Sequence, residues 1–179
     1  MRVKSKVYYE TRGKILSVEA DRSHRCRPDR KGENMNDLKQ TVGFLQRVPL
    51  FHGLNNRQLE RLAKRMVDRH YAAGQPMVIQ GHGGEGFFVV VAGKAEAFRE
   101  RADGDKVPVN TFGPTDFFGE LALLDAGLRT ASVIASEPSQ CLALTRWDFL
   151  AALREDAEMS VIILQELAKR FRRALDSLE

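Results

Sequence analysis

A short stretch at the centre of the chain, residues 118–132, has the residue types of a site for a small phosphate ester. Gly119 has no Cβ, so the backbone can approach an anion closely there. Good helix formers follow it, and we expect the free N–H groups of Leu121 and Ala122 at the start of a short helix to face the anion. Arg129 supplies a planar guanidinium that binds a phosphate through two parallel hydrogen bonds. The stretch therefore predicts a phosphate-binding site.

Glu120 stands within this stretch, although a carboxylate is a poor neighbour for a phosphate. Its negative charge needs a different partner in the same ligand. In other nucleotide sites an acidic side chain accepts a hydrogen bond from a ribose hydroxyl. We therefore expect Glu120 to bind the ribose of a singly charged nucleotide.

Residues 118–123 read FGELAL, and after a short loop residues 129–132 read RTAS. This pattern resembles the phosphate-binding cassette of cyclic nucleotide-binding domains, with every position of the cassette filled. The family includes catabolite activator proteins, the regulatory subunits of cyclic-AMP-dependent protein kinase and cyclic-nucleotide-gated channels. The resemblance implies that Glu120 binds the ribose, and that the cyclic phosphate is bound by Gly119, Leu121, Ala122, Arg129 and Thr130. Because Glu120 and Arg129 are both retained, we expect a working site and not a vestigial pocket.

Residues that bind the phosphate and the ribose do not show whether the base of the nucleotide is adenine or guanine. In the resembled family, Thr at the position of Thr130 occurs in several cyclic GMP sites and also in some cyclic-AMP-responsive channels. We favour cyclic AMP as the commoner bacterial-type ligand, with cyclic GMP as the alternative and no further cofactor. The resemblance also implies that the last helix covers the base, and its cations are long enough to stack on a purine: Lys169, Arg170 and Arg173.

The elements that position this site are short β-rich runs between about residues 67 and 145, separated by glycine turns. This spacing predicts an antiparallel jelly-roll barrel, so the fold class is mainly β with flanking helices. The helix of residues 120–123 interrupts the barrel between two strands, where a pocket is expected. The predicted strands are Met77–Gln80, Phe87–Ala92, Lys94–Arg99, Val107–Phe112, Thr130–Ala135 and Cys141–Thr145.

Helical patterns flank the barrel on both sides. The first begins at Asn36, and a second is capped by Asn55 or Asn56. The chain is helical again over about residues 146–178. In the last helix, from about Glu158, an apolar stripe recurs at three- and four-residue spacing, formed by Leu164, Leu167, Phe171, Ala174 or Leu175, and Leu178. In the resembled family this helix pairs with its twin, so we expect a homodimer; the alternative is that the stripe packs on its own barrel.

Positive charge is concentrated in an N-terminal extension, residues 1–34, which holds ten Lys or Arg and five Asp or Glu. The remaining domain, residues 35–179, is nearly neutral. The extension is expected to be a solvated tail or a weak hairpin around Arg12-Gly13, with an acidic surface or nucleic acid as its alternative partner. The chain has no membrane span, no signal peptide, and two cysteines far apart, Cys26 and Cys141, so a cytoplasmic location is expected.

An enzyme is not expected. A cupin-type metal site would need paired histidines, and no His-x-His occurs; His82 with Glu85 is too little. No helix-turn-helix follows the last helix, so direct sequence-specific DNA binding is not expected either. The sequence predicts a regulatory module that binds a cyclic nucleotide and signals through its C-terminal helix to a separate partner. The alternative is a ligand-free jelly roll that acts as an interaction or scaffold module.

Overall fold

The computed structural model describes residues 6–11, 14–19, 35–83 and 86–176, and the chain divides into two compact units. In the first unit, strands β1 (Lys6–Thr11) and β2 (Lys14–Glu19) form an antiparallel hairpin. The register places Tyr9 opposite Leu16. The Arg12-Gly13 turn that the sequence predicts lies outside the described residues, as do Cys26, Glu85 and Leu178.

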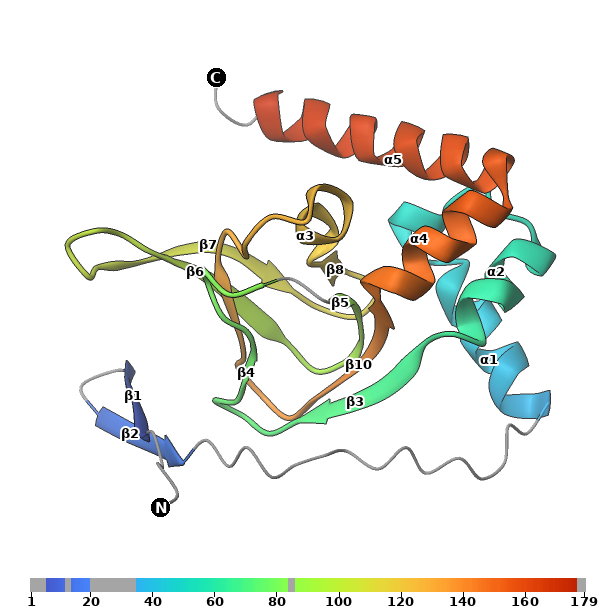
Figure 1. Cartoon of the computed structure of the whole chain (residues 1–179). Coiled ribbons are helices and arrows are strands. Elements are labelled where there is room, and N and C mark those ends of the chain that lie inside the picture. Colours follow the sequence, from blue (N-terminus) through green and yellow to red (C-terminus); the bar gives the residue numbers. More distant parts are fainter. Residues whose placement is uncertain (1–5, 12–13, 20–34, 84–85, 177–179) are drawn as a thin grey trace, which may run out of the picture. The chain divides into compact units, whose positions relative to one another are not determined.

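The second unit is a jelly roll of two four-stranded antiparallel sheets (Figure 1). The strand orders are β3-β10-β5-β8 in one sheet and β4-β9-β6-β7 in the other. The first sheet consists of β3 (Val67–Tyr71), β10 (Ser139–Thr145), β5 (Gly86–Ala92) and β8 (Phe117–Phe118). The second consists of β4 (Pro76–Val78), β9 (Ser132–Ala135), β6 (Ala95–Glu100) and β7 (Lys106–Phe112).

Strand β5 is the centre of the core because both of its faces are buried. Val90 lies in the apolar cluster inside the barrel, while Phe87 and Val89 lie in the cluster shared with the helices. A strand covered on both faces reads as a continuous apolar run, as residues 87–91 do. The Phe87 ring lies 5.8 Å from that of Phe51, so the barrel and the N-terminal helices share one aromatic core.

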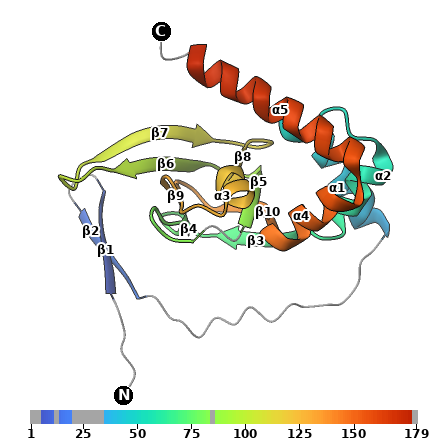
Figure 2. The same cartoon turned by 45° about the horizontal axis from the view of Figure 1, so that its top comes forward.

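Helices α1, α2 and α4 gather at one end of the barrel, and the long terminal helix α5 runs from there past α3 (Figure 2). An asparagine, Asn55, caps α2 through a reciprocal capping box with Gln58. Thr145 caps α4 by accepting a hydrogen bond from the Asp148 N–H. The helices are α1 (Met35–Leu45), the 3-10 helix η1 (Pro49–Phe51), α2 (Asn56–Ala63), α3 (Glu120–Asp125), α4 (Arg146–Glu155) and α5 (Ala157–Asp176).

The fold class expected from the sequence is confirmed, and the differences are local. Strands β3 and β8 were not among the predicted strands. The sequence of β3, VDRHY, is half exposed at a sheet edge and has no apolar alternation, while β8 has two residues only. Among the described residues, no helix combines the length and the apolar character that a membrane crossing requires.

Candidate functional site

The loop that joins β8 to α3 is built around a glycine in the left-handed conformation. Gly119 has a φ of 87° and is the N-cap of α3. A Cβ at this position would lie 2.8 Å from the carbonyl oxygen of Gly86 and would also collide with the Arg129 guanidinium. A side chain is therefore excluded on two grounds, conformation and space. The glycine lets the loop and the arginine pack directly against each other.

Arg129 is fixed in place by hydrogen bonds to backbone. Its guanidinium donates from Nη1 to the Gly119 carbonyl oxygen at 3.1 Å and from Nη2 to the Gly86 carbonyl oxygen. Its own N–H donates to the His82 carbonyl, and its carbonyl accepts from the Gly81 N–H, both at 2.9 Å. These contacts hold a cation that is only 7% exposed. Burial lowers the pKa of the Arg129 guanidinium, and the nearby Glu120 carboxylate acts in the opposite direction.

Glu120 begins α3 and is also 7% exposed. Its Oε1 lies 3.6 Å from Nη1 of Arg170, which comes from the second half of α5. The Arg170 guanidinium lies over the ring of Phe117, with its Cζ 4.4 Å from the ring centroid. One cation of the terminal helix is thus held by the first residue of α3 and by the strand that precedes it.

A cavity of about 170 Å³ opens between these groups and the second sheet, and we call it the α3 cavity. Most of the lining side chains are apolar, and the two buried charged ones are Glu120 and Arg129. Few polar groups on a mostly apolar wall are typical of a small-molecule site. The cavity is lined by Val78, Ala97, Val109, Asn110, Phe112, Phe118, Gly119, Glu120, Leu121, Leu128, Arg129, Thr130, Ala131, Val133 and Arg170.

Most of the residues singled out by the sequence meet at this cavity. Those that line it are Gly119, Glu120, Leu121, Arg129, Thr130 and Arg170, while Ala122 lies in the first turn of α3. The other two candidate cations of α5, Lys169 and Arg173, do not line it. Lys169 Nζ is paired with Glu166 at 2.6 Å, and Arg173 donates to the Lys169 carbonyl oxygen. Of the three candidate cations, Arg170 is therefore the one placed to meet a ligand.

Sequence reasoning missed the wall formed by the second sheet. The register places Ala97 opposite Asn110 on one side and opposite Val133 on the other, so these three residues form one row across β7, β6 and β9. All three line the α3 cavity. The Asn110 side-chain oxygen accepts a hydrogen bond from the Thr111 N–H. No local motif marks such a row, and only the strand pairing could have revealed it.

The apolar stripe expected on the terminal helix divides into two faces. Leu167 packs, partly buried, against the core cluster, whereas Leu164 and Phe171 are 60% and 66% exposed. The exposed residues follow a three-four spacing, which is that of a coiled-coil seam. We call this set the α5 seam: Val161, Leu164, Ala168, Phe171 and Leu175.

A metal centre receives no support from the residues described. Within ranges 6–11, 14–19, 35–83 and 86–176, no group of three or more His, Cys, Asp or Glu side chains could hold a metal ion. The α3 cavity is instead equipped with one buried cation, one buried carboxylate and an apolar wall. This arrangement suits recognition of an anionic ligand with a hydroxyl group and an apolar or aromatic part.

Comparison with known proteins agrees with this chemistry. Residues 68–156 match the family described as "Cyclic nucleotide-binding domain". The chain is 36% identical over 126 residues to the "Cyclic AMP receptor protein" of Thermus thermophilus, an alignment that covers 70% of this chain and 58% of that protein. It thus spans less than two thirds of that relative's length.

Solved structures give the same result over a longer share of a relative. The N-terminal domain of a transcriptional regulator from Streptomyces coelicolor is similar with a TM-score of 0.66 and 32% identity, covering 74% of this chain and 95% of that one. The regulatory domain of Toxoplasma gondii PKA, solved with cAMP, has a TM-score of 0.69 at 24% identity and covers 77% of this chain and 51% of its own. The second likeness supports the fold.

Proposed function

This chain belongs to the cyclic nucleotide-binding domain family, and from that premise we propose that it is a regulatory module that binds cyclic AMP in the α3 cavity. The observation that carries the proposal is the buried Arg129 beside an apolar cavity. Burying a cation costs free energy unless an anion or hydrogen-bond acceptors compensate it. Two backbone carbonyls occupy two of its five N–H donors, and a cyclic phosphate is a fitting partner for the rest.

The phosphate and the ribose are assigned to the start of α3. Arg129 would bind the cyclic phosphate together with the backbone of Gly119, Leu121 and Ala122 and with Thr130. The Glu120 carboxylate would accept a hydrogen bond from the ribose hydroxyl. Its second oxygen can do so while the first keeps its contact with Arg170.

The base would lie in the part of the α3 cavity that Thr130 and Arg170 line. Arg170 already lies over an aromatic ring, Phe117, and a guanidinium held in this way can extend its stacking to a purine. Lys169 and Arg173 are weaker candidates because both have partners on α5 itself. We favour cyclic AMP over cyclic GMP because the Thermus thermophilus relative is named a cyclic AMP receptor. Thr130→Ala tests this choice: if Thr130 selects the base, the ratio of the two affinities changes.

The output would pass through α5. Its Arg170 contacts the ribose-binding Glu120, so a ligand that changes this contact makes different interactions with two positions of the helix, as a ligand-driven switch requires. The α5 seam offers a surface for a second copy of the chain, because apolar residues at three-four spacing pair two helices. A homodimer through α5 that acts on a separate effector protein is therefore our proposal for the assembly.

The alternative function is a ligand-free scaffold in which the seam is the contact surface. Calorimetric titration separates the two. The wild-type chain should release or absorb heat with cyclic AMP, and 5′-AMP is the matched control because it has the same base and sugar without the cyclic ester. Arg129→Ala should lose the signal. If neither cyclic AMP nor cyclic GMP gives heat or raises the melting temperature of the wild type, the scaffold reading stands.

A further inference from the structure

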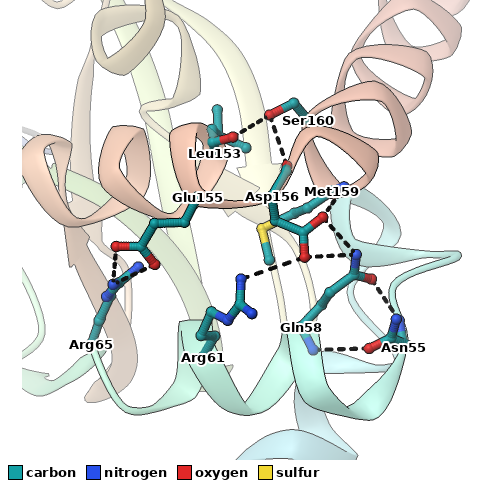
Figure 3. A network of polar contacts seen from close by, with 9 residues as sticks. All are labelled: Asn55, Gln58, Arg61, Arg65, Leu153, Glu155, Asp156, Met159 and Ser160. Carbon is teal, nitrogen blue, oxygen red and sulfur yellow. Dashed lines mark hydrogen bonds and ion pairs between the residues drawn. The ribbon is translucent and has the colours of Figure 1, made fainter.

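The junction between α4 and α5 is tied to α2 by a relay of hydrogen bonds (Figure 3). It runs through Asn55, Gln58, Asp156 and Met159, and we call these four residues the α2–α5 clamp. Asp156 is the residue between the two helices, and its Oδ1 accepts a hydrogen bond from the Met159 N–H at 2.9 Å. Asp156 thereby caps the start of α5.

Gln58 joins this cap to the N-terminal helices. Its side-chain oxygen accepts from the Asn55 N–H at 3.0 Å, which completes the capping box of α2. With the oxygen fixed in that way, the amide nitrogen faces Asp156 and donates to both carboxylate oxygens at 3.2 Å. Gln58 is only 3% exposed, so water cannot replace these hydrogen bonds and their loss costs free energy.

The two halves of α5 are held very differently. Met159 and Ile163 are fully buried in the cluster shared with η1 and α2. Of residues 168–176, only Arg170 is partly shielded from solvent. The helix is therefore anchored at its first half, and its second half reaches the α3 cavity through Arg170.

The geometry makes the far half sensitive to the anchor. Arg170 lies fourteen residues after Asp156, or about 21 Å along a helix. A tilt of roughly 10° at the junction would move Arg170 by about 3–4 Å over that length. A shift of this size is enough to separate Arg170 from Glu120, which now lie 3.6 Å apart.

We infer that Gln58 and Asp156 are positioning residues for the nucleotide site: the α2–α5 clamp sets the orientation of α5 and thereby keeps Arg170 in the lining of the α3 cavity. The inference rests on the proposed function, because it assigns a role in nucleotide affinity to residues that no ligand touches. The inference also gives the N-terminal helices a role. Because α2 and α5 are joined at this point, α2 would either move with α5 or oppose its movement.

The test uses an exchange of hydrogen-bonding groups. Gln58→Glu keeps the capping box, because a carboxylate still accepts from the Asn55 N–H, but it sets two carboxylates against each other. Asp156→Asn keeps the oxygen that caps Met159 and accepts one hydrogen bond from Gln58, but it sets an amide nitrogen against the Gln58 amide nitrogen in place of the second carboxylate oxygen. The double variant Gln58→Glu/Asp156→Asn restores one donor and one acceptor. The matched control is Glu155→Gln, which weakens the neighbouring pair of Arg65, in the turn after α2, and Glu155, at the end of α4, and leaves α5 untouched.

Affinity for cyclic AMP, measured well below the unfolding temperature of each variant, is the deciding quantity. Each single variant should bind about five- to tenfold more weakly, which is the lower end of ordinary coupling between sites. The double variant should return to within about twofold of the wild type, and Glu155→Gln should stay there too. Single variants that melt at lower temperature yet bind as the wild type does would make the clamp merely structural and overturn the inference.

Failure of the proposed function would look different. In that case the wild type itself would not bind cyclic AMP. Hydrogen exchange over residues 157–167 without nucleotide then still tests the clamp, because exchange should be faster in both single variants and restored in the double variant. Unchanged exchange in the single variants would overturn the clamp whatever the ligand is.

Discussion

The loop of residues 118–132 and the terminal helix α5 both reach the α3 cavity, but they are held in opposite ways. In the loop, Arg129 is buried and hydrogen-bonded to the carbonyls of Gly86 and Gly119. In α5, residues 168–176 are exposed except for the partly shielded Arg170. The loop is therefore formed before a ligand arrives, whereas the second half of the helix can respond to one. The proposed function therefore assigns recognition and response to different parts of the molecule.

Among the variants considered, replacement of Arg129 should reduce the affinity for the cyclic nucleotide most. Arg129→Ala removes a charge-assisted pair with the phosphate, which costs roughly 2–5 kcal/mol, or about 30- to 5,000-fold in affinity. It also leaves two backbone carbonyls without their donor, so the free energy of unfolding should fall by about 1–3 kcal/mol. Calorimetry and urea unfolding measure the two effects. Arg129→Lys is the control, since it keeps the charge without the planar fork and should keep part of the affinity.

A charged residue introduced on the α5 seam should weaken the proposed homodimer and leave nucleotide binding unchanged. Phe171→Glu places a carboxylate in the proposed seam between two helices, where it would be desolvated and face its own copy. The dissociation constant of the dimer should rise by at least about tenfold. Sedimentation velocity over a range of concentrations measures it. Gln165→Glu adds the same charge on the exposed surface beside the seam and should leave the dimer intact. Equal behaviour of the two variants would argue against the seam.

Arg170 is the link between the two regions, and its removal should have a moderate effect. Arg170→Ala loses the contact with Glu120 and the stacking on Phe117, so cyclic AMP should bind about three- to tenfold more weakly. Glu120→Gln tests the other partner, and an amide can still accept from a ribose hydroxyl. Lys169→Ala is the matched control, because Lys169 pairs with Glu166 and does not line the cavity. A larger loss for Lys169→Ala than for Arg170→Ala would mean that a different face of α5 meets the ligand.

The smallest expected effect concerns pH and the anchor of α5. The Met159 N–H, followed by Gln58 and Arg61, holds the pKa of the Asp156 carboxyl below its usual value. The unfolded chain therefore binds a proton first as pH falls, so the stabilisation is complete above about pH 4 and is lost as pH drops through the lowered pKa. Urea unfolding between pH 6 and pH 3 should show a shallower loss of stability for Asp156→Asn than for the wild type. Parallel curves would contradict this.

The recognition region could be predicted from the sequence because its parts are close along the chain. Gly119, Glu120 and Arg129 lie within eleven residues, and local chemistry suffices to assign roles to them. The barrel strands could also be predicted from the sequence where apolar runs alternate with glycine turns. Strand β3 could not be predicted in this way. It lies at a sheet edge, and its pairing with β10 stabilises it without an apolar pattern in its own sequence.

The response region could be predicted only in outline. The sequence places four cations on the last helix, Lys169, Arg170, Arg172 and Arg173, but which one faces the α3 cavity depends on the roll of α5 about its axis. That roll is set by Met159 and Ile163 in the core and by Gln58, which lies 98 residues before Asp156. Likewise, Asn110 joins the cavity through pairing of β7 with β6. Contacts of such long range leave no local mark on the sequence.

Hydrogen exchange with and without saturating cyclic AMP tests the central claim most directly, since one experiment reports on the loop and on α5 together. The account predicts added protection at residues 118–132, where the ligand binds, and at residues 168–176, where α5 closes over it, with little change in strands β3 and β10. Binding is verified by calorimetry on the same sample. Identical protection of residues 168–176 in both states, with binding confirmed, would contradict the assignment of the response to α5.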